Sequence, residues 1–309
     1  NGIYTYGVAN DKTYKSASWD ASKMADTWNS MDNWQTLTAR ASVIGGGSLQ
    51  FGLRSDTFIQ FDDFHLTYLG SDLLISEATA VWTTVHNNLA ALDATALPDA
   101  AETAITTELE KQIPSKLAEI DSATNALQAL IDSYDGIKSA FDEYKALKAT
   151  IEDLKNTSKY TFTGTEALST FNSTLSTIDG NAEAATDAAT LTDLLSSLKT
   201  AGNTFVGSIE SSDGFDLTYN IVNNSFETGA LSPWTTNGSN DTGVKPNSNE
   251  TYTTTGVDGS YLFNTWNNGA GSKVSQTLSS LPNGYYTVTA LVASDAGNTI
   301  NILAGATTK

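Results

Sequence analysis

The chain has 309 residues, of which 39% are hydrophobic and 17% are charged, enough to bury cores in about two domains. It carries 16 Lys and Arg against 35 Asp and Glu, which gives a formal net charge of -19. Because so acidic a chain does not neutralise phosphate, its composition argues against nucleic acid and anionic membranes as partners. Cysteine is absent, which excludes disulfides, thiolate metal sites and a cysteine nucleophile.

The composition also bears on where the protein is found. There is no signal-peptide pattern and no apolar run long enough to span a bilayer. The chain starts at Asn1 rather than Met, so we expect a processed form or an excerpt. Ser, Thr, Asn and Gly are abundant and Lys and Arg are rare, as is typical of exported proteins. We therefore expect an extracellular or bacterial cell-surface location without membrane insertion.

The first seventy residues have the patterns of strands. Apolar residues alternate with polar ones over 37–43 and again over 49–53, and three glycines at 45–47 separate the two runs. This pattern predicts a β-hairpin with one buried face. A further strand is predicted over 59–68, and its apolar face switches sides at Asp62 and Asp63, which indicates a β-bulge.

The middle of the chain changes to helical spacing after Gly70. Apolar residues recur at intervals of three and four over 71–92, from 99 onward, from Pro114 to 154, and again over 163–178 and 190–205. Capping patterns begin at Thr163 and Thr190. We expect residues 71–212 to form an antiparallel α-helical bundle whose apolar stripes are its core, or alternatively a groove for a partner. With its Tyr160-x-x-x-Gly164 lead-in, it loosely resembles the three-helix spacers of bacterial surface proteins and glycosidases.

Strand patterns return in the last hundred residues. Residues 286–292 alternate, and Ile300 and Ile302 suggest one more strand. The stretches NNSFETGALSPW at 223–234 and KVSQTLSSLPNGYYTVTALV at 273–292 resemble the galactose-binding-like β-sandwich of bacterial carbohydrate-binding modules. The resemblance implies an antiparallel jelly-roll sandwich, and the fold class it predicts is α+β multidomain, a sandwich plus the helical bundle.

The resemblance also implies that this sandwich is split between the two ends of the chain. Residues 213–309 would form its N-terminal half, and residues 1–70, with a closing Phe-Asp-Asp-Phe strand at 61–64, its C-terminal half. Neither half would be stable alone, because each would expose unpaired strand edges. The halves could close within one chain, pair head to tail between neighbouring chains, or belong to a tandem array. The sequence leaves these three alternatives open.

The same resemblance implies a structural calcium ion. In this family the metal lies between the Glu of the opening strand and an Asp of the closing strand, here Glu227 and Asp62, with Asp63 as the alternative to Asp62. Carboxylate oxygens beside a bulged strand suit calcium. Paired surface carboxylates without an ion are the other interpretation.

Aromatic residues in polar loops are candidates for sugar binding. Rings stack on the apolar faces of sugars while neighbouring amides and carboxylates bond the hydroxyls. The candidates are Trp266, Trp28, Trp234 and Tyr252, and Trp266 comes first because it lies among amides in FNTWNNG. Ordinary loop packing is the alternative for each of them.

Nothing in the sequence assigns catalytic residues. The two histidines, His65 and His86, belong to a predicted strand and a predicted helix. Their placement does not indicate a Ser-His-Asp triad. We therefore expect a non-catalytic glycan-binding module with a helical spacer, of the kind that is attached to a glycoside hydrolase as an accessory segment. The alternative is a structural repeat of a surface fibre or adhesin, completed head to tail by neighbouring units.

Overall fold

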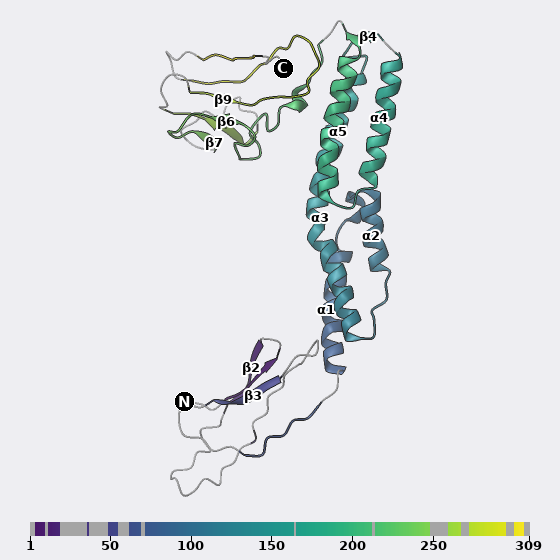
Figure 1. Cartoon of the computed structure of the whole chain (residues 1–309), viewed down its shortest axis with the longest axis vertical. Coiled ribbons are helices and arrows are strands. Elements are labelled where there is room, and N and C mark those ends of the chain that lie inside the picture. The colour runs from purple at the N-terminus through teal and green to yellow at the C-terminus, as the bar shows by residue number, and fades with distance from the viewer. Residues whose placement is uncertain are drawn as a thin grey trace. The chain divides into compact units, whose positions relative to one another are not determined.

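The computed structural model describes residues 4–9, 12–18, 36, 49–54, 62–68, 72–163, 165–211, 214–247, 259–266, 272–294 and 300–305 (Figure 1). The chain divides into two compact units. The first comprises Asn1–Thr84 and Ile113–Thr124, and the second comprises Val85–Gln112 and Asn125–Lys309. Each unit is described by itself.

Helices dominate the described part of the chain. The α-helices are α1 (Asp72–Ala90), α2 (Asp99–Leu109), α3 (Leu117–Glu152), α4 (Thr165–Glu183) and α5 (Ala188–Gly207). Short 3-10 turns are η2 (Ala94–Ala96), η3 (Asp153–Lys155) and η4 (Thr218–Asn220). The helices lie where the apolar spacing of three and four predicts them. No helix among these described residues is both long and apolar enough to cross a bilayer.

The longest helix, α3, has 36 residues, which corresponds to roughly 54 Å at about 1.5 Å per residue. Gly136 lies within it without breaking it. Ile151, Tyr144, Phe141 and Ile137 on its apolar stripe are buried, so this stripe is a packed core and not an open groove.

Contacts between helices give their directions. Tyr144 of α3 contacts Asp179 of α4, and Lys155, just after α3, contacts Asn172. Positions that rise along α3 meet positions that fall along α4, so these two helices are antiparallel. Buried side chains occur along α3, α4 and α5. The large ones include Leu127, Tyr134, Ile137, Phe141, Tyr144, Ile151, Leu154, Phe171, Leu175, Ile178, Leu191, Leu198 and Phe205.

The first turn of α5 differs in detail from the sequence prediction. Asp187, and not Thr190, is its N-cap residue: the Thr190 backbone N–H donates to Asp187 Oδ1 at 2.8 Å, and the Thr190 hydroxyl donates to Oδ2 at 2.9 Å. These bonds satisfy a backbone N–H that the helix leaves unpaired. They also lower the pKa of the Asp187 carboxyl, the backbone bond from Thr190 being the larger cause.

Strands are short and form small antiparallel sheets. In the first unit β1 (Tyr4–Ala9) lies between β2 (Lys12–Ser18) and β3 (Leu49–Arg54). In the second unit β4 (Phe162–Thr163) pairs with β5 (Glu210–Ser211), β6 (Thr235–Thr236) with β9 (Val274–Ser275), and β7 (Gly243–Pro246) with β8 (Tyr261–Asn264). Most of these strands have two to four residues.

The predicted β-sandwich is therefore wrong for the described residues, and the fold class is corrected from α+β multidomain to mainly helical. The same finding contradicts the resemblance to a galactose-binding-like module joined to a helical spacer. Residues 62–68 and 286–292 have alternating patterns but belong to no strand. The physical reason is that alternation prepares a segment for a sheet, whereas a strand forms only when a partner completes its hydrogen bonds.

The predicted hairpin and bulge have different outcomes. The 49–53 run is a strand, β3, but it pairs with β1, and 37–43 lies outside the described residues. At the predicted bulge, Asp63 has a positive φ of 58°, and its backbone N–H donates to Asp62 Oδ1 at 2.8 Å. The backbone does turn there, although residues 62–68 form no strand.

A buried polar cluster joins α5 to the region that follows it. Asn203, on α5, is 7% exposed and bonds Tyr219, Asn220 and the Ser280 carbonyl. Next to it, a side chain at Gly202 would lie 2.7 Å from Tyr219 Oη and 2.9 Å from Ile151 Cδ1. The absence of a side chain at Gly202 thus lets the 219–220 turn approach the helix closely.

Candidate functional site

The β7–β8 ladder carries a group of polar side chains around its Gly243–Asn264 end. Asn264 Nδ2 donates to the Asp241 carbonyl at 2.7 Å, and Thr265 Oγ1 lies 3.2 Å from both Thr242 Oγ1 and Ser272 Oγ. The antiparallel pairing explains this meeting, because it places the residues before β7 beside those after β8. Residues far apart in sequence thus form one hydrogen-bonded rim.

Asp241 is the most constrained member of this rim. Its φ is +38°, in the left-handed region, which Asp tolerates better than most residues do. Its carboxylate forms an ion pair with Lys245 at 2.6 Å, and the carboxylate is half-exposed. The rim therefore brings a carboxylate, an ammonium group and a side-chain amide together at one end of the β7–β8 ladder.

Trp266 directly follows these residues and is 60% exposed. It lies two positions after Asn264, whose amide fixes the Asp241 loop. An exposed indole next to fixed polar groups is the combination by which proteins hold a sugar ring, with the ring stacked on its apolar face and the hydroxyls hydrogen-bonded. We call Trp266, Asn264, Asp241, Lys245 and Thr265 the Trp266 rim.

The other predicted platform residues are placed differently. The Trp234 indole N–H donates to the carbonyls of Val222 and Asn223 at 3.1 and 3.0 Å, and its ring packs at 5.4 Å from Phe226. These contacts make Trp234 a half-buried residue that pins the 222–226 loop. Trp28 and Tyr252 lie outside the described residues, so their part in sugar binding stays a prediction.

Glu227, the predicted calcium ligand, has a structural task. Its carboxylate accepts the backbone N–H groups of Ser260 at 2.7 Å and Tyr261 at 3.0 Å, at the entry to β8. Gly259 has a φ of +77°, and a side chain there would overlap the Glu227 carboxylate. Glu227 thus holds the turn that starts β8.

Asp62 and Asp63 lie in the first unit, whereas Glu227 lies in the second. Both aspartates are exposed. Asp63 contacts His65 at 3.0 Å, and Asp62 caps the Asp63 backbone N–H. Within the described residues, no three His, Asp or Glu side chains gather as a metal site would require. Calcium coordination by Glu227 with Asp62 or Asp63 stays a prediction.

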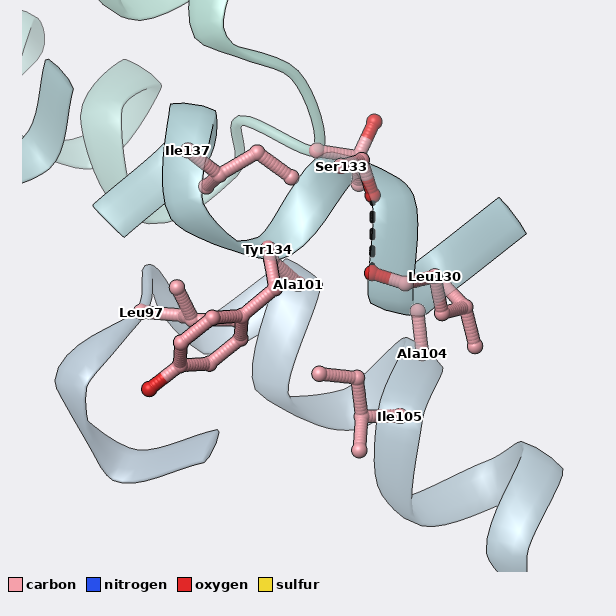
Figure 2. A pocket seen from close by; sticks show the side chains of 9 residues that line it. Leu97, Ala101, Ala104, Ile105, Leu130, Ser133, Tyr134 and Ile137 are labelled. Atoms are coloured by element: carbon pink, nitrogen blue, oxygen red, sulfur yellow. Dashed lines mark hydrogen bonds between the residues drawn. The ribbon is translucent and has the colours of Figure 1, made fainter. Parts of the chain in front are cut away.

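Figure 2 shows an apolar cavity between α2 and α3. It has a volume of about 60 Å³ and is far smaller than typical ligand pockets of about 300–1,000 Å³. The side chains around it carry no charge, and Ser133 and Tyr134 bond the carbonyls of Leu130 and Asp93. The cavity is a packing gap in the helical core. Its lining residues are Leu97, Ala101, Ala104, Ile105, Leu130, Ser133, Tyr134, Ile137 and Thr186.

A more open groove of about 210 Å³ lies between α3 and α4. Its charges are used in pairs: Lys148 lies 2.5 Å from Asp179, and Lys155 lies 3.8 Å from Glu152. Burial, and next the charge of Asp179, raise the pKa of the Tyr144 hydroxyl, which donates to Asp179 at 3.3 Å. The Lys148–Asp179 pair joins α3 to α4, whereas Lys155 and Glu152 are three residues apart along the chain.

Sequence reasoning named Trp266 as a candidate, which stays a prediction, but did not find the polar residues near it. Asp241, Lys245 and Thr265 have no distinguishing local pattern, because the pairing of β7 with β8 is what brings them together. The i, i+4 spacing of Asp241 and Lys245 was the one signal in the sequence, and it is weak outside a helix.

A comparison of the chain with protein-family models, with curated proteins and with solved structures found no match.

Proposed function

We propose that this protein binds glycans through the Trp266 rim and that it does so without catalysis, outside the cell. The observation that carries the proposal is the exposed indole of Trp266 beside side chains already fixed by hydrogen bonds. Because hydrogen bonds already hold these polar side chains, they lose little conformational freedom when a sugar binds, and this favours affinity. The acidic surface suits a neutral sugar better than a polyanion.

The polar groups fit the hydroxyls of a sugar. Asp241 supplies carboxylate oxygens that accept, Lys245 supplies N–H donors, and Thr265 can do both. The Asp241 side chain is 50% exposed and that of Lys245 is 31% exposed, so hydroxyls can replace water around the pair at modest cost. The groups lie at one end of the β7–β8 ladder, whose strands have four residues each, and this small extent limits the ligand to one or two sugar rings at the rim.

Affinity electrophoresis of the full chain through gels containing neutral polysaccharides tests this proposal. We expect retardation by at least one polysaccharide, and we expect Trp266→Ala to weaken it at least tenfold, about 1.4 kcal/mol. The control is Tyr68→Ala, which removes another exposed aromatic ring, from the first unit. Unchanged retardation of Trp266→Ala, or none for the unmodified chain, would refute glycan binding at this rim.

A structural role in an assembly is the second candidate. Large apolar side chains over 285–303 are exposed, including Tyr285, Leu291 and Leu303, as in proteins that associate. Head-to-tail completion of a split sandwich is not part of this candidate, because the described residues form only small separate sheets and no sandwich. Sedimentation equilibrium over a concentration series decides whether the chain associates.

A further inference from the structure

We infer that residues 285–293 form an antiparallel strand pair with the same segment of a second copy of this chain. The inference deepens the structural role above and rests on it, but not on glycan binding. The first observation behind it is that the backbone of this segment is unpaired within the described residues. Residues 287–293 make no backbone hydrogen bond to another described residue, and Figure 1 draws no strand arrow there. Their sequence nevertheless alternates as a strand does.

The side chains of this segment are also uncovered. Val288 is 49% exposed, Val292 is 57% exposed and Leu291 is 76% exposed. Strand-forming apolar residues with an unpaired backbone are a template for another strand. Packing of Val288 and Val292, which share one face of the paired strands, against the second copy would be the main apolar gain on pairing.

Charge favours the same segment of a second copy as the partner. Residues 274–294 contain no Asp, Glu, Lys or Arg, whereas the whole chain has a net charge of -19. Two copies repel each other over most of their surface. At this segment they can meet without bringing like charges together, so the neutral stretch is where self-association costs least.

The sequence also fits itself in antiparallel register. With Thr289 opposite its own copy, Tyr286 lies opposite Val292, and Val288 lies opposite Ala290. All four are then on one face of the paired strands, because side chains alternate. The register also gives a closed two-fold dimer, which is the commonest symmetric assembly.

The segment is anchored at its start, which keeps it in place for pairing. The Ser280 carbonyl accepts from buried Asn203 at 3.2 Å, Pro282 packs at Gly207 of α5, and the Tyr286 hydroxyl donates to the Pro282 carbonyl. A held strand loses less freedom on pairing than a free one.

Sedimentation equilibrium of the full chain is the first test. We expect a concentration-dependent dimer and no larger species. Val288→Glu places two carboxylates about 7 Å apart across the two-fold axis at roughly 3.3 Å per residue, so we expect at least tenfold weaker association. Val222→Glu is the control, with the same change at a side chain of similar exposure, 46%, outside the segment. Circular dichroism at 222 nm verifies that both variants keep the helices.

Cross-linking tests the register, and the absence of native cysteine makes a single introduced thiol unambiguous. Thr289→Cys would lie opposite its own copy at about 4.5–5.5 Å between Cα atoms, within disulfide reach. Thr287→Cys would lie opposite Leu291, roughly 13 Å from its own copy at about 3.3 Å per residue. Under mild oxidation we expect a covalent dimer from Thr289→Cys and little from Thr287→Cys.

Each contrary result overturns the inference. A monomer at all concentrations refutes both the pairing and the structural role. Association that Val288→Glu and Val222→Glu affect alike refutes the pairing but leaves an assembly through another surface. Open-ended polymers would indicate head-to-tail contact, and equal cross-linking of the two cysteine variants would refute the register.

Discussion

Substitution of Asn203 measures how much its hydrogen bonds between α5 and the following region contribute to the free energy of unfolding. Its side-chain amide Nδ2 donates to Asn220 Oδ1 at 2.9 Å and to the Ser280 carbonyl at 3.2 Å, and its Oδ1 accepts from Tyr219 at 2.8 Å. Asn203→Leu keeps a similar volume but removes every one of these bonds. Tyr219, Asn220 and the Ser280 carbonyl then lose their hydrogen bonds to this residue.

The expected cost follows from these partners. Leaving a buried polar group unpaired costs about 1–3 kcal/mol. Tyr219 and Asn220 are half-buried, whereas Ser280 is exposed. We therefore take the low end for Tyr219 and Asn220, count nothing for the Ser280 carbonyl, and expect about 2 kcal/mol of lost unfolding free energy. Leu has a higher helix propensity than Asn, which offsets about 0.5 kcal/mol of this loss in unfolding free energy.

Guanidinium unfolding followed at 222 nm measures this change in unfolding free energy. Asn125→Leu is the matched control, since it makes the same substitution at an exposed position of α3, where we expect less than about 0.5 kcal/mol. Adding Tyr219→Phe to Asn203→Leu should recover part of the loss, because the unpaired hydroxyl is removed. The reasoning is refuted if Asn203→Leu and Asn125→Leu unfold at the same denaturant concentration.

Three further changes are expected to act locally. Gly202→Ala should cost about 1–3 kcal/mol in denaturant unfolding, because its Cβ would crowd Tyr219 and Ile151, whereas Gly180→Ala, with open space around it, should stabilise α4. Asp187→Asn should lower the thermal unfolding temperature at pH 7 but not at about pH 2. Since the folded pKa of Asp187 is lowered, its charge stabilises above the ordinary value of 3.8 and the effect is lost as pH falls through the folded pKa. Glu227→Gln should lower the unfolding temperature even in EDTA, because one of its two backbone N–H bonds is lost.

The contrary outcomes are equally specific. Equal effects of Gly202→Ala and Gly180→Ala would contradict the close approach at α5. A pH-independent difference for Asp187→Asn would contradict the charged N-cap. A loss for Glu227→Gln that appears only with calcium present would contradict the purely structural role and favour the predicted metal.

Much of the helical region could be predicted because a helix satisfies its own backbone hydrogen bonds. The apolar spacing of 71–92 predicts α1, and that of 114–154 predicts α3. The buried side chains of α3, such as Ile137 and Tyr144, are those that the stripe selects. The N-cap of α5 was misplaced at Thr190, because Asp and Thr are both good capping residues and the choice depends on where the chain turns.

The β regions could not be predicted in the same way. Alternation over 286–292 is as clear as it is over 49–53, yet only the latter is a strand, β3, and its partner β1 comes from a distant part of the sequence. The family resemblance extended this local pattern into a sandwich, although local patterns do not contain the pairing of strands. The same limit hid Asp241 and Lys245, which join Asn264 only through the β7–β8 ladder.

The sequence by itself determined the acidic, cysteine-free character of the chain, the positions of its helices and the exposed-aromatic candidate Trp266, since each of these depends on composition or on neighbours along the chain. The tertiary structure decided what surrounds them: the rim at Trp266, the cluster at Asn203, and the use of Glu227 in a turn. The physical reason is the range of the interactions. Helix hydrogen bonds close within four residues, whereas a strand, a rim or a buried amide depends on partners that only folding brings near.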